Sequence, residues 1–239
     1  MTTATTTQTP ASTADSVATI HLARLPLNPR SRDVHQDLRD HTALHQRVSA
    51  LYPDILGTTP RAAHNILYRL ERERTGATLL IQSTNITINR NALPSNYTAP
   101  GVDVEYREIG PLLDWAALGR TVRYRIDANP TKSQPSPKDG PGKRPRGRRI
   151  PLTGEDAVTW WERQAERAGL TLNLSLDSPQ PPVLATRGTN RRARLTVTRF
   201  DGIATITNPN NLRHAITTGI GQGRAYGLGL LSIAPHHEQ

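Results

Sequence analysis

Two successive β-α-β-β-α patterns along 239 residues predict an α+β protein of two tandem ferredoxin-like (RRM-like) domains. Strands are indicated by alternating apolar and polar residues, helices by apolar residues three and four apart, and element ends by proline and glycine. A C-terminal glycine-rich loop follows the second pattern. We expect a disordered tail at 1–16, a first domain at 17–112 and a second at 119–235, with a hinge near 111–120.

The first pattern starts with an alternating strand at 17–27. A helix is predicted over 41–52, where leucine and valine recur at helical spacing up to Pro53. Residues 62–85 predict a hairpin with a Thr-Gly turn in its middle, and 109–118 predict a short helix that opens with a proline. This helix completes the first β-α-β-β-α order.

The second pattern starts with a strand at 121–130, which ends at a proline. A loop rich in proline, glycine and positive charge follows at 133–149. The clearest helix of the chain spans 153–169. Thr153 is its expected N-cap, acidic residues occupy its first turn, and Gly169 ends it.

The remaining elements repeat the order of the first half. An alternating strand is predicted at 170–176, and a hairpin at 191–208 about the Asp-Gly pair at 201–202. A helix with a proline near its start spans 208–220. After the glycines, the apolar run 228–235 predicts a buried strand.

The charge balance favours a polyanionic partner. The net charge is +10, the pI is about 10.7, and all but three of the 30 basic residues are arginine. Arginine presents a planar fork of donors that suits phosphate. Nucleic acid is therefore the first expectation and a membrane surface the second. A genome rich in G and C would explain arginine over lysine, but not the clusters described below.

Other compositional features exclude several classes of protein. The chain has no cysteine, which removes disulfides, thiol nucleophiles and cysteine metal sites. No apolar run approaches the roughly 20 residues that span a bilayer. The N-terminus is rich in Thr, Ala and Ser and lacks the basic start and apolar middle of a signal peptide. We therefore expect a cytoplasmic protein.

Five glycines fall within eleven positions near the C-terminus. No Gly-Lys-Ser/Thr follows, so this is not a Walker loop. A helix precedes the glycines and a strand follows them, the reverse of the order in a dinucleotide fingerprint. Two readings stay open: a cradle for a phosphate backbone, or a tight connection packed on the neighbouring domain. The candidate residues are Gly219, Gly221, Gly223, Arg224, Gly227 and Gly229.

Two basic clusters are candidates for phosphate contact, one at 138–149 and one at 187–199. A basic hairpin can enter a wide nucleic-acid groove, and each neutralised phosphate adds to the salt dependence of binding. A solvated charged face is the alternative. The candidate residues are Arg144, Arg146, Arg148, Arg149, Arg187, Arg191, Arg192 and Arg194.

The eight histidines carry no HExxH or HxH spacing, and few carboxylates lie near them, so no metal site is expected. His41 and His45 lie four apart on the first predicted helix and share a face. They form either an exposed polar face or a general acid or base.

The C-terminal motif resembles one family. Gly-x-Gly, five residues and a second Gly-x-Gly precede Leu230-Leu231-Ser232 and Ala234-Pro235, and an Ala-Asn-Pro element ends the strand at residue 130. Over about 17–235 the chain resembles the CasE family, the CRISPR RNA-processing endoribonucleases of type I-E Cascade in the RAMP superfamily.

The resemblance implies two ferredoxin-like folds and metal-independent, cofactor-free cleavage at the base of a CRISPR repeat hairpin. His45 matches the catalytic histidine of the family, as acid or base. Thr42 stands where members carry a tyrosine, and His41 is a substitute by spacing alone. We add Lys132 as a candidate for stabilising charge on the reacting phosphate.

The implied partners are the repeat RNA hairpin and other Cascade subunits, with no membrane and a monomer when free. Two alternatives stay open. One is a non-catalytic RNA-hairpin clamp in the same complex, and the other is a general nucleic-acid-binding protein of the ribosomal type.

Overall fold

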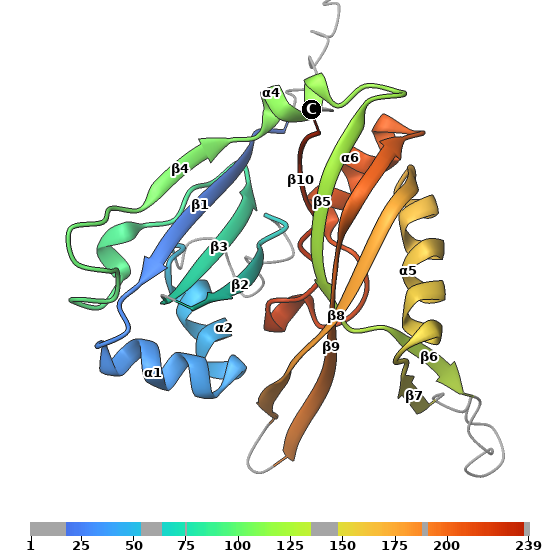
Figure 1. The fold of residues 1–239 in the computed structure, drawn as a ribbon. Helices are drawn as coiled ribbons and strands as arrows, with labels where there is room; N and C mark the ends of the chain where they lie inside the picture. The colour runs from blue at the N-terminus through green and yellow to red at the C-terminus, as the bar shows by residue number, and fades with distance from the viewer. Residues whose placement is uncertain (1–17, 54–63, 75, 135–147, 188–190, 237–239) are drawn as a thin grey trace, which may run out of the picture.

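The computed structural model describes residues 18–53, 64–74, 76–134, 148–187 and 191–236, and these form two antiparallel sheets that stand side by side (Figure 1). The first sheet has the order β2-β3-β1-β4. Its strands are β1 (Ile20–Leu27), β2 (Leu67–Glu73), β3 (Gly76–Thr84) and β4 (Glu105–Glu108).

The second sheet has the order β10-β5-β9-β8, which is the same spatial order with the strands counted from the other edge. Its strands are β5 (Thr121–Ala128), β8 (Leu170–Arg187), β9 (Arg191–Ile206) and β10 (Ser232–Pro235). A separate two-stranded sheet pairs β6 (Thr131–Gln134) with β7 (Arg148–Pro151). The predicted tandem ferredoxin-like architecture is confirmed.

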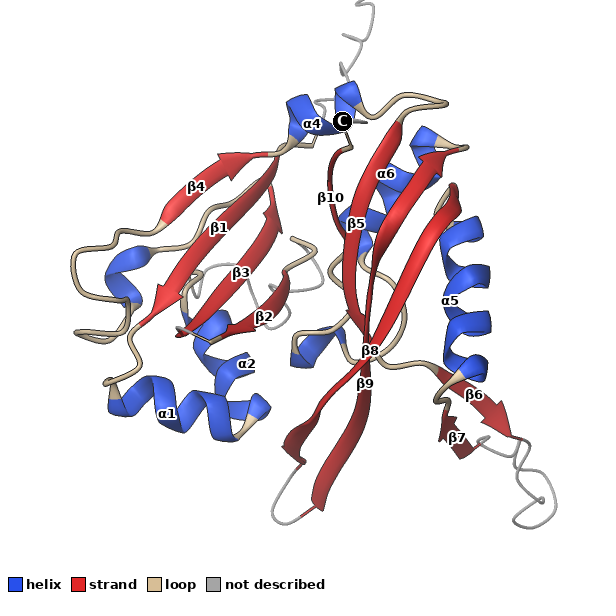
Figure 2. Cartoon of the chain, in the orientation of Figure 1, coloured by secondary structure: helices blue, strands red, loops and turns tan. Residues whose placement is uncertain are grey.

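Helices cover these sheets as the apolar faces require. On the second sheet α5 and α6 pack on one face (Figure 2), and on the first α2 buries Leu44 and Val48 in the core. In the first half a single 3-10 turn, η2 (Arg90–Ala92), lies between β3 and β4. The helices are α1 (Arg32–Arg39), α2 (His41–Ala50), α4 (Gly110–Trp115), α5 (Glu155–Arg167) and α6 (Pro209–Thr218).

Two elements of the first half, α1 and β4, were not predicted from the sequence patterns. Helix α1 has little apolar character and is anchored by polar contacts: Asp37 accepts hydrogen bonds from Arg47 Nε at 2.8 Å and from the Tyr97 hydroxyl at 2.9 Å. Strand β4 is exposed throughout, so it shows no alternation. The predicted helix at 109–118 is the shorter α4. It follows β4, and its Leu113 packs in the core of the second half.

The predicted hairpin turn at 201–202 is wrong. Strand β9 runs straight through these residues and pairs with β8 as far as Arg187 and Arg191, and 188–190 lie outside the described residues. The register shifts between Leu172 and Leu174, which marks a bulge. A Cβ at Gly202 would collide with the carbonyl oxygen of Leu174 there. The glycine therefore serves close backbone approach and not a turn.

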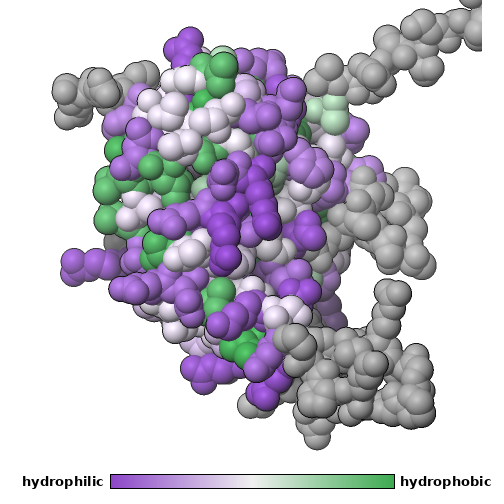
Figure 3. Space-filling model, turned by 90° about the vertical axis from the view of Figure 1, so that its right-hand side faces the viewer, coloured by the Kyte–Doolittle hydropathy of each residue, from purple (hydrophilic) through white to green (hydrophobic). Residues whose placement is uncertain are grey.

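Helix α5 matches its prediction except at its N-terminus. Gly154 and not Thr153 is the N-cap, and no side chain caps the helix. Trp161 is fully buried, stacks on Phe200 with ring centroids 5.5 Å apart, and donates a hydrogen bond to the Tyr124 hydroxyl. The outer side is charged, and Figure 3 shows hydrophilic residues dominating this side of the molecule.

Two loop predictions need smaller corrections. Both ends of the predicted loop at 133–149 are paired strand, in β6 and β7, and 135–147 lies outside the described residues. The predicted buried strand at 228–235 is buried at 228–231 but becomes a strand only from Ser232 onward. The buried part is an irregular segment that joins the glycine loop to β10.

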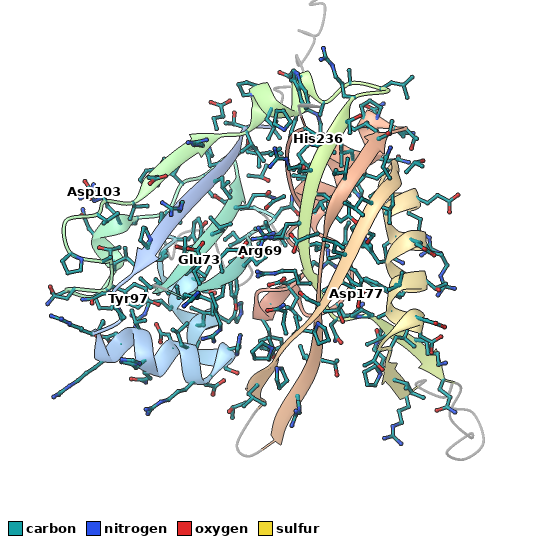
Figure 4. All side chains as sticks on the ribbon, viewed as in Figure 1. Arg69, Glu73, Tyr97, Asp103, Asp177 and His236 are labelled. Atoms are coloured by element: carbon teal, nitrogen blue, oxygen red, sulfur yellow. The ribbon has the colours of Figure 1, made fainter. Side chains whose placement is uncertain are left out.

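A buried arginine ties the two halves together. Arg69 of β2 is 2% exposed and lies at the seam between the sheets (Figure 4). Its guanidinium donates to Glu71 Oε1 at 2.8 Å. It also donates to the carbonyl oxygens of Arg125 and Leu230, at 3.1 and 2.9 Å, in the second half. Its hydrogen bonds are thus shared between both halves.

Two neighbouring contacts follow the same plan. Gln82 Nε2 donates to the Ile216 carbonyl at 2.7 Å, and the Tyr68 hydroxyl donates to the Ala225 carbonyl at 2.9 Å. In each, a side chain of the first sheet satisfies a main-chain acceptor of the second half. These acceptors belong to irregular or terminal segments that the second sheet does not pair.

Glu71 sits among three guanidinium groups at the seam. It pairs with Arg69 at 2.8 Å, Arg199 at 3.0 Å and Arg125 at 3.3 Å. Burial alone would raise the pKa of Glu71, but the charges of these arginines hold it below its ordinary value. Arg199 also forms a bidentate pair with Asp127.

Replacing Arg69 by alanine should therefore destabilise the protein strongly. We expect the Arg69→Ala variant to lose about 3–5 kcal/mol of unfolding free energy, because Glu71 and two carbonyls lose a buried partner. Arg24→Ala, which breaks an exposed pair with Glu105, should lose about 0–1 kcal/mol. Urea denaturation measures both. Equal losses would show that Arg69 is not the tie between the halves.

Candidate active site

Helix α2 presents its two histidines to the second half of the molecule. Asp40 caps the helix by accepting a hydrogen bond from the Thr42 amide at 2.8 Å. The ring of His45 lies edge-on to that of Tyr226, with centroids 6.4 Å apart and an interplanar angle of 69°. Tyr226 belongs to the glycine loop, in the 3-10 turn η3 (Arg224–Tyr226). The histidine predicted to be catalytic therefore lies where the two halves meet.

The hydroxyl of Thr42 fastens α2 to strand β8. It donates to the Thr186 carbonyl at 3.0 Å and accepts from the Thr186 amide at 2.8 Å. The Thr186 hydroxyl donates to Asp40 Oδ2 at 2.9 Å. Burial alone would raise the pKa of Asp40, but its hydrogen bonds to Thr42 and Thr186 hold that pKa below its ordinary value. We call these contacts the threonine clasp.

His41 lines a small cavity of about 50 Å³ between α2, β2 and the β8–β9 ribbon, together with Arg72 and Tyr226. Its Nδ1 is buried without a hydrogen-bond partner among the described residues. Burial and then the charge of nearby Arg72 lower the pKa of His41, and the Leu184 backbone and the charge of Asp40 oppose this shift only in part. These effects together favour the uncharged imidazole.

The glycine loop is pressed against protein. A Cβ at Gly219 would meet Leu67, one at Gly221 would meet Trp160, and one at Gly227 would meet the Tyr68 ring. Gly227 and Gly229 are buried. These contacts support the open alternative of a tight connection packed on the neighbouring domain, since Leu67 and Tyr68 belong to β2.

Arg224 and Arg199 are engaged within the fold. Arg224 donates to the Thr218 carbonyl at 2.7 Å, which satisfies an acceptor at the C-terminus of α6. An RNA phosphate bound by Arg224, as predicted, would have to share the guanidinium with this carbonyl. Arg199, counted in the basic cluster at 187–199, is paired with Asp127 and Glu71 at the seam. Its guanidinium is therefore not available for the phosphate contact predicted for the cluster.

The other arginines of that cluster lie along the end of the β8–β9 ribbon. Arg191 pairs with Arg187, and Arg192 pairs with Thr186, the residue of the threonine clasp. Arg194 is exposed and lies opposite Leu184. The clasp therefore holds this end of the ribbon, hereafter the basic tip, beside the helix that carries His45.

The other cluster and Lys132 lie elsewhere. Arg148 and Arg149 are exposed on β7, while Arg144 and Arg146 fall outside the described residues. Figure 1 shows β6 and β7 on the opposite side of the β8–β9 ribbon from α2. Lys132 is exposed on β6, opposite Ile150. The structure does not bring Lys132 to His45.

Sequence reasoning missed Tyr226. The only available signal was a single tyrosine placed between two glycines of the loop. Gly223 and Gly227, on either side of η3, both adopt left-handed backbone, with φ of 83° and 82°. The ring packs against a small cluster formed by Val183, Val197 and Leu228.

Comparisons with known proteins place the chain in a family. Residues 20–235 match the family model described as CRISPR associated protein, and the chain belongs to this family. It is 26% identical over 211 residues to the CRISPR system Cascade subunit CasE of Escherichia coli, covering 86% of this chain and 94% of CasE. It is also 26% identical over 234 residues to the CRISPR-associated endoribonuclease Cse3 of Thermus thermophilus, covering 90% of this chain and 99% of Cse3.

Solved structures give the same result. A CRISPR endoribonuclease Cse3 bound to a 19 nt RNA superposes with a TM-score of 0.73 at 26% identity, covering 90% of this chain and all of that one. Thermus thermophilus Cse3 bound to an RNA representing a pre-cleavage complex gives 0.70 at 26% identity, covering 91% of this chain and all of that one. The predicted resemblance to the CasE family is confirmed.

No described helix is long and apolar enough to cross a membrane. No group of three or more His, Asp or Glu side chains in the described ranges could hold a metal ion.

Adding a side chain at Gly227 should be costly for a reason beyond its backbone angle. Gly227→Ala must adopt a φ near 82° and also push its Cβ into the Tyr68 ring, whereas Gly101→Ala meets a φ of 74° in open space. We expect a loss of about 1–2 kcal/mol for Gly101→Ala and about 1–3 kcal/mol more for Gly227→Ala. Thermal and urea unfolding measure the difference, and equal losses would contradict close packing at Gly227.

The half-buried His41, whose pKa is lowered, should make stability fall in acid. Its pKa in the folded chain lies below the ordinary 6.5, so the unfolded chain binds the proton more readily. Stability should therefore fall as the pH drops below about 6.5, and His41→Gln should lose less between pH 7 and pH 5 than the wild type. Denaturation at a series of pH values measures this. Parallel curves for the two proteins would show that His41 titrates normally.

Proposed function

We propose that this chain is a metal-independent endoribonuclease that binds the CRISPR repeat hairpin, cleaves precursor CRISPR RNA at the hairpin base, and stays bound as a Cascade subunit. The named activities of the relatives, a Cascade subunit and a CRISPR-associated endoribonuclease, support it. The observation that carries it is the threonine clasp, which holds the basic tip beside the helix of His45. A phosphate gripped by the tip would lie close to an imidazole.

The proposed reaction uses the RNA as its own nucleophile. A ribose 2′-oxygen attacks the adjacent phosphorus, the O2′–P bond forms, and the P–O5′ bond breaks. One proton leaves the 2′-hydroxyl and one is delivered to the departing O5′. The products are a 2′,3′-cyclic phosphate and a 5′-hydroxyl, and the reaction balances without water or an electron carrier. Alignment of attacker and phosphorus within one nucleotide supplies much of the rate.

His45 is the proposed general acid or base, a role typically worth about 10²–10⁴-fold. His41 stays a second candidate, because an uncharged imidazole can accept a proton and its cavity is shared with Tyr226. For Thr42 we propose a positioning role through the clasp instead of a chemical one. Lys132 has no proposed role at the reacting phosphate, because β6 lies on the other side of the ribbon from α2.

RNA binding is assigned mainly to the basic tip, with Arg187, Arg191, Arg192 and Arg194. The deep major groove of A-form RNA limits base reading, so these residues would recognise phosphates and the shape of the stem. The exposed Arg148 and Arg149 of β7 would make a separate contact with the RNA. A cytoplasmic location and a monomeric state when free stay predictions.

A second candidate function is a hairpin clamp that does not cleave. The clasp favours it, because the Thr42 hydroxyl is engaged with Thr186 on both its donor and its acceptor side. Such a protein would bind the repeat hairpin tightly and leave it intact.

The deciding experiment uses a 5′-labelled CRISPR repeat hairpin RNA from the encoding genome, incubated with the full chain in EDTA. We expect cleavage by the wild type and by His35→Ala, an exposed histidine on α1, and a fall of about 10²–10⁴-fold for His45→Ala. A single 2′-deoxy substitution at the cleaved nucleotide should abolish cleavage and leave binding intact.

The outcomes separate the alternatives. A 2′,3′-cyclic phosphate product supports the proposal, whereas 3′-hydroxyl and 5′-phosphate ends contradict it. Binding of the repeat without cleavage by any variant supports the clamp. Equal affinity for an unrelated RNA duplex supports a general nucleic-acid-binding protein.

A further inference from the structure

We propose that Tyr226 is a positioning residue for His45, and that the two glycines that flank its turn, Gly223 and Gly227, help to hold this tyrosine in place. This inference rests on the proposed function, because His45 matters only if the chain cleaves RNA. It assigns a role to a residue that neither the motifs nor the resemblance singled out.

The contact itself is the first step. The rings of His45 and Tyr226 meet edge to face, with centroids 6.4 Å apart at 69°, an orientation that aromatic pairs favour. The torsion that turns an imidazole about its Cβ–Cγ bond is broad, so a neighbouring group must define the direction of its two nitrogens. Tyr226 contacts that imidazole from the opposite half of the molecule.

Tyr226 is itself held on several sides. Its ring packs against the cluster of Val183, Val197 and Leu228, of which the first two belong to the β8–β9 ribbon. Its amide donates to the Gly223 carbonyl at 2.7 Å. The carbonyl of the preceding residue, Ala225, accepts a hydrogen bond from the Tyr68 hydroxyl. The ring is therefore fixed relative to both sheets.

The glycines allow the backbone to adopt the conformation that places Tyr226 beside His45. Gly223 and Gly227 adopt left-handed conformations immediately before and after η3. A side chain at Gly227 would displace the ring of Tyr68, and one at Gly223 would meet Leu228. Tyr68 and Leu228 are the same residues that support Tyr226. A substitution at either glycine therefore disturbs the support of the tyrosine before it reaches any bound RNA.

The consequence concerns rate more than affinity. The basic tip and the imidazole lie on different halves, and Tyr226 packs on the ribbon that carries the first while contacting the second. Loss of the aromatic ring should let the imidazole turn away from the reacting phosphate. The arginines of the tip should keep their grip, since the threonine clasp is untouched.

The test compares Tyr226→Leu and Tyr226→Phe in single-turnover cleavage of the labelled repeat hairpin in EDTA, with the dissociation constant measured in parallel. Tyr226→Leu should cleave about 10²-fold more slowly with an affinity within about twofold of wild type. Tyr226→Phe, which keeps the ring, should restore the rate. Tyr106→Leu, at a 43% exposed tyrosine of β4, is the matched control and should cleave like wild type.

A second readout does not depend on activity. The ring-current shift of the His45 imidazole proton, followed by NMR in the free protein, should be shared by wild type and Tyr226→Phe and be lost in Tyr226→Leu. If Tyr226→Leu does not fold, Tyr226→Met fills the same space with a flexible apolar chain and replaces it in both measurements.

Several results would overturn the inference. One is a His45 resonance that does not move in Tyr226→Leu. Another is an unchanged rate at saturating RNA with weakened binding, which would make Tyr226 an RNA contact only. A third is Tyr226→Phe as slow as Tyr226→Leu, which would make the hydroxyl the active group. Failure of the proposed function looks different: wild type and all variants would then leave the hairpin intact.

Discussion

The rest of the structure depends on the hydrogen bonds that the guanidinium group of Arg69 makes between the two halves. This group sits at the seam and donates to an acidic neighbour on its own strand and to two carbonyls of the other half. Tyr68 and Gln82 repeat the arrangement on either side. The candidate site is assembled across this seam, with His45 from the first half and Tyr226 and the basic tip from the second. A small rotation of one sheet against the other would separate these groups. The polar contacts at the seam therefore determine what surrounds the His45 imidazole.

Arginine has two different uses in this chain. Arg69 and Arg199 are buried or nearly so and neutralise Glu71 and Asp127, and Arg224 satisfies the end of a helix. Arg148 and Arg194 are exposed on strands. A buried guanidinium keeps its charge only when carboxylates or carbonyls replace the lost water. Carboxylates balance Arg69 and Arg199 inside the fold, whereas Arg148 and Arg194 face the solvent.

Much of the architecture could be predicted from the sequence, since alternation and helical spacing reflect burial directly. The strand at 17–27, the hairpin at 62–85 and α5 follow from those patterns. Helix α1 could not, because a carboxylate bound to Arg47 and Tyr97 replaces the apolar stripe. The Asp-Gly pair at 201–202 gave a wrong prediction because glycine serves both turns and close backbone approach, and only the opposing bulge decides between them.

For the site, helical periodicity placed His41 and His45 on one face. No local pattern could reveal that Tyr226 lies against His45, nor that β6 carries Lys132 to the other side of the ribbon.

The threonine clasp restricts which side chains positions 42 and 186 can carry. The side chain at position 42 must be short, must both donate and accept, and must leave room for the Thr186 backbone. A phenol ring there would force the ribbon away from the helix, and it would strand the carboxylate of Asp40 without its hydroxyl donor. Replacing either threonine removes hydrogen bonds made by the other, so the side chains tolerated at positions 42 and 186 depend on each other.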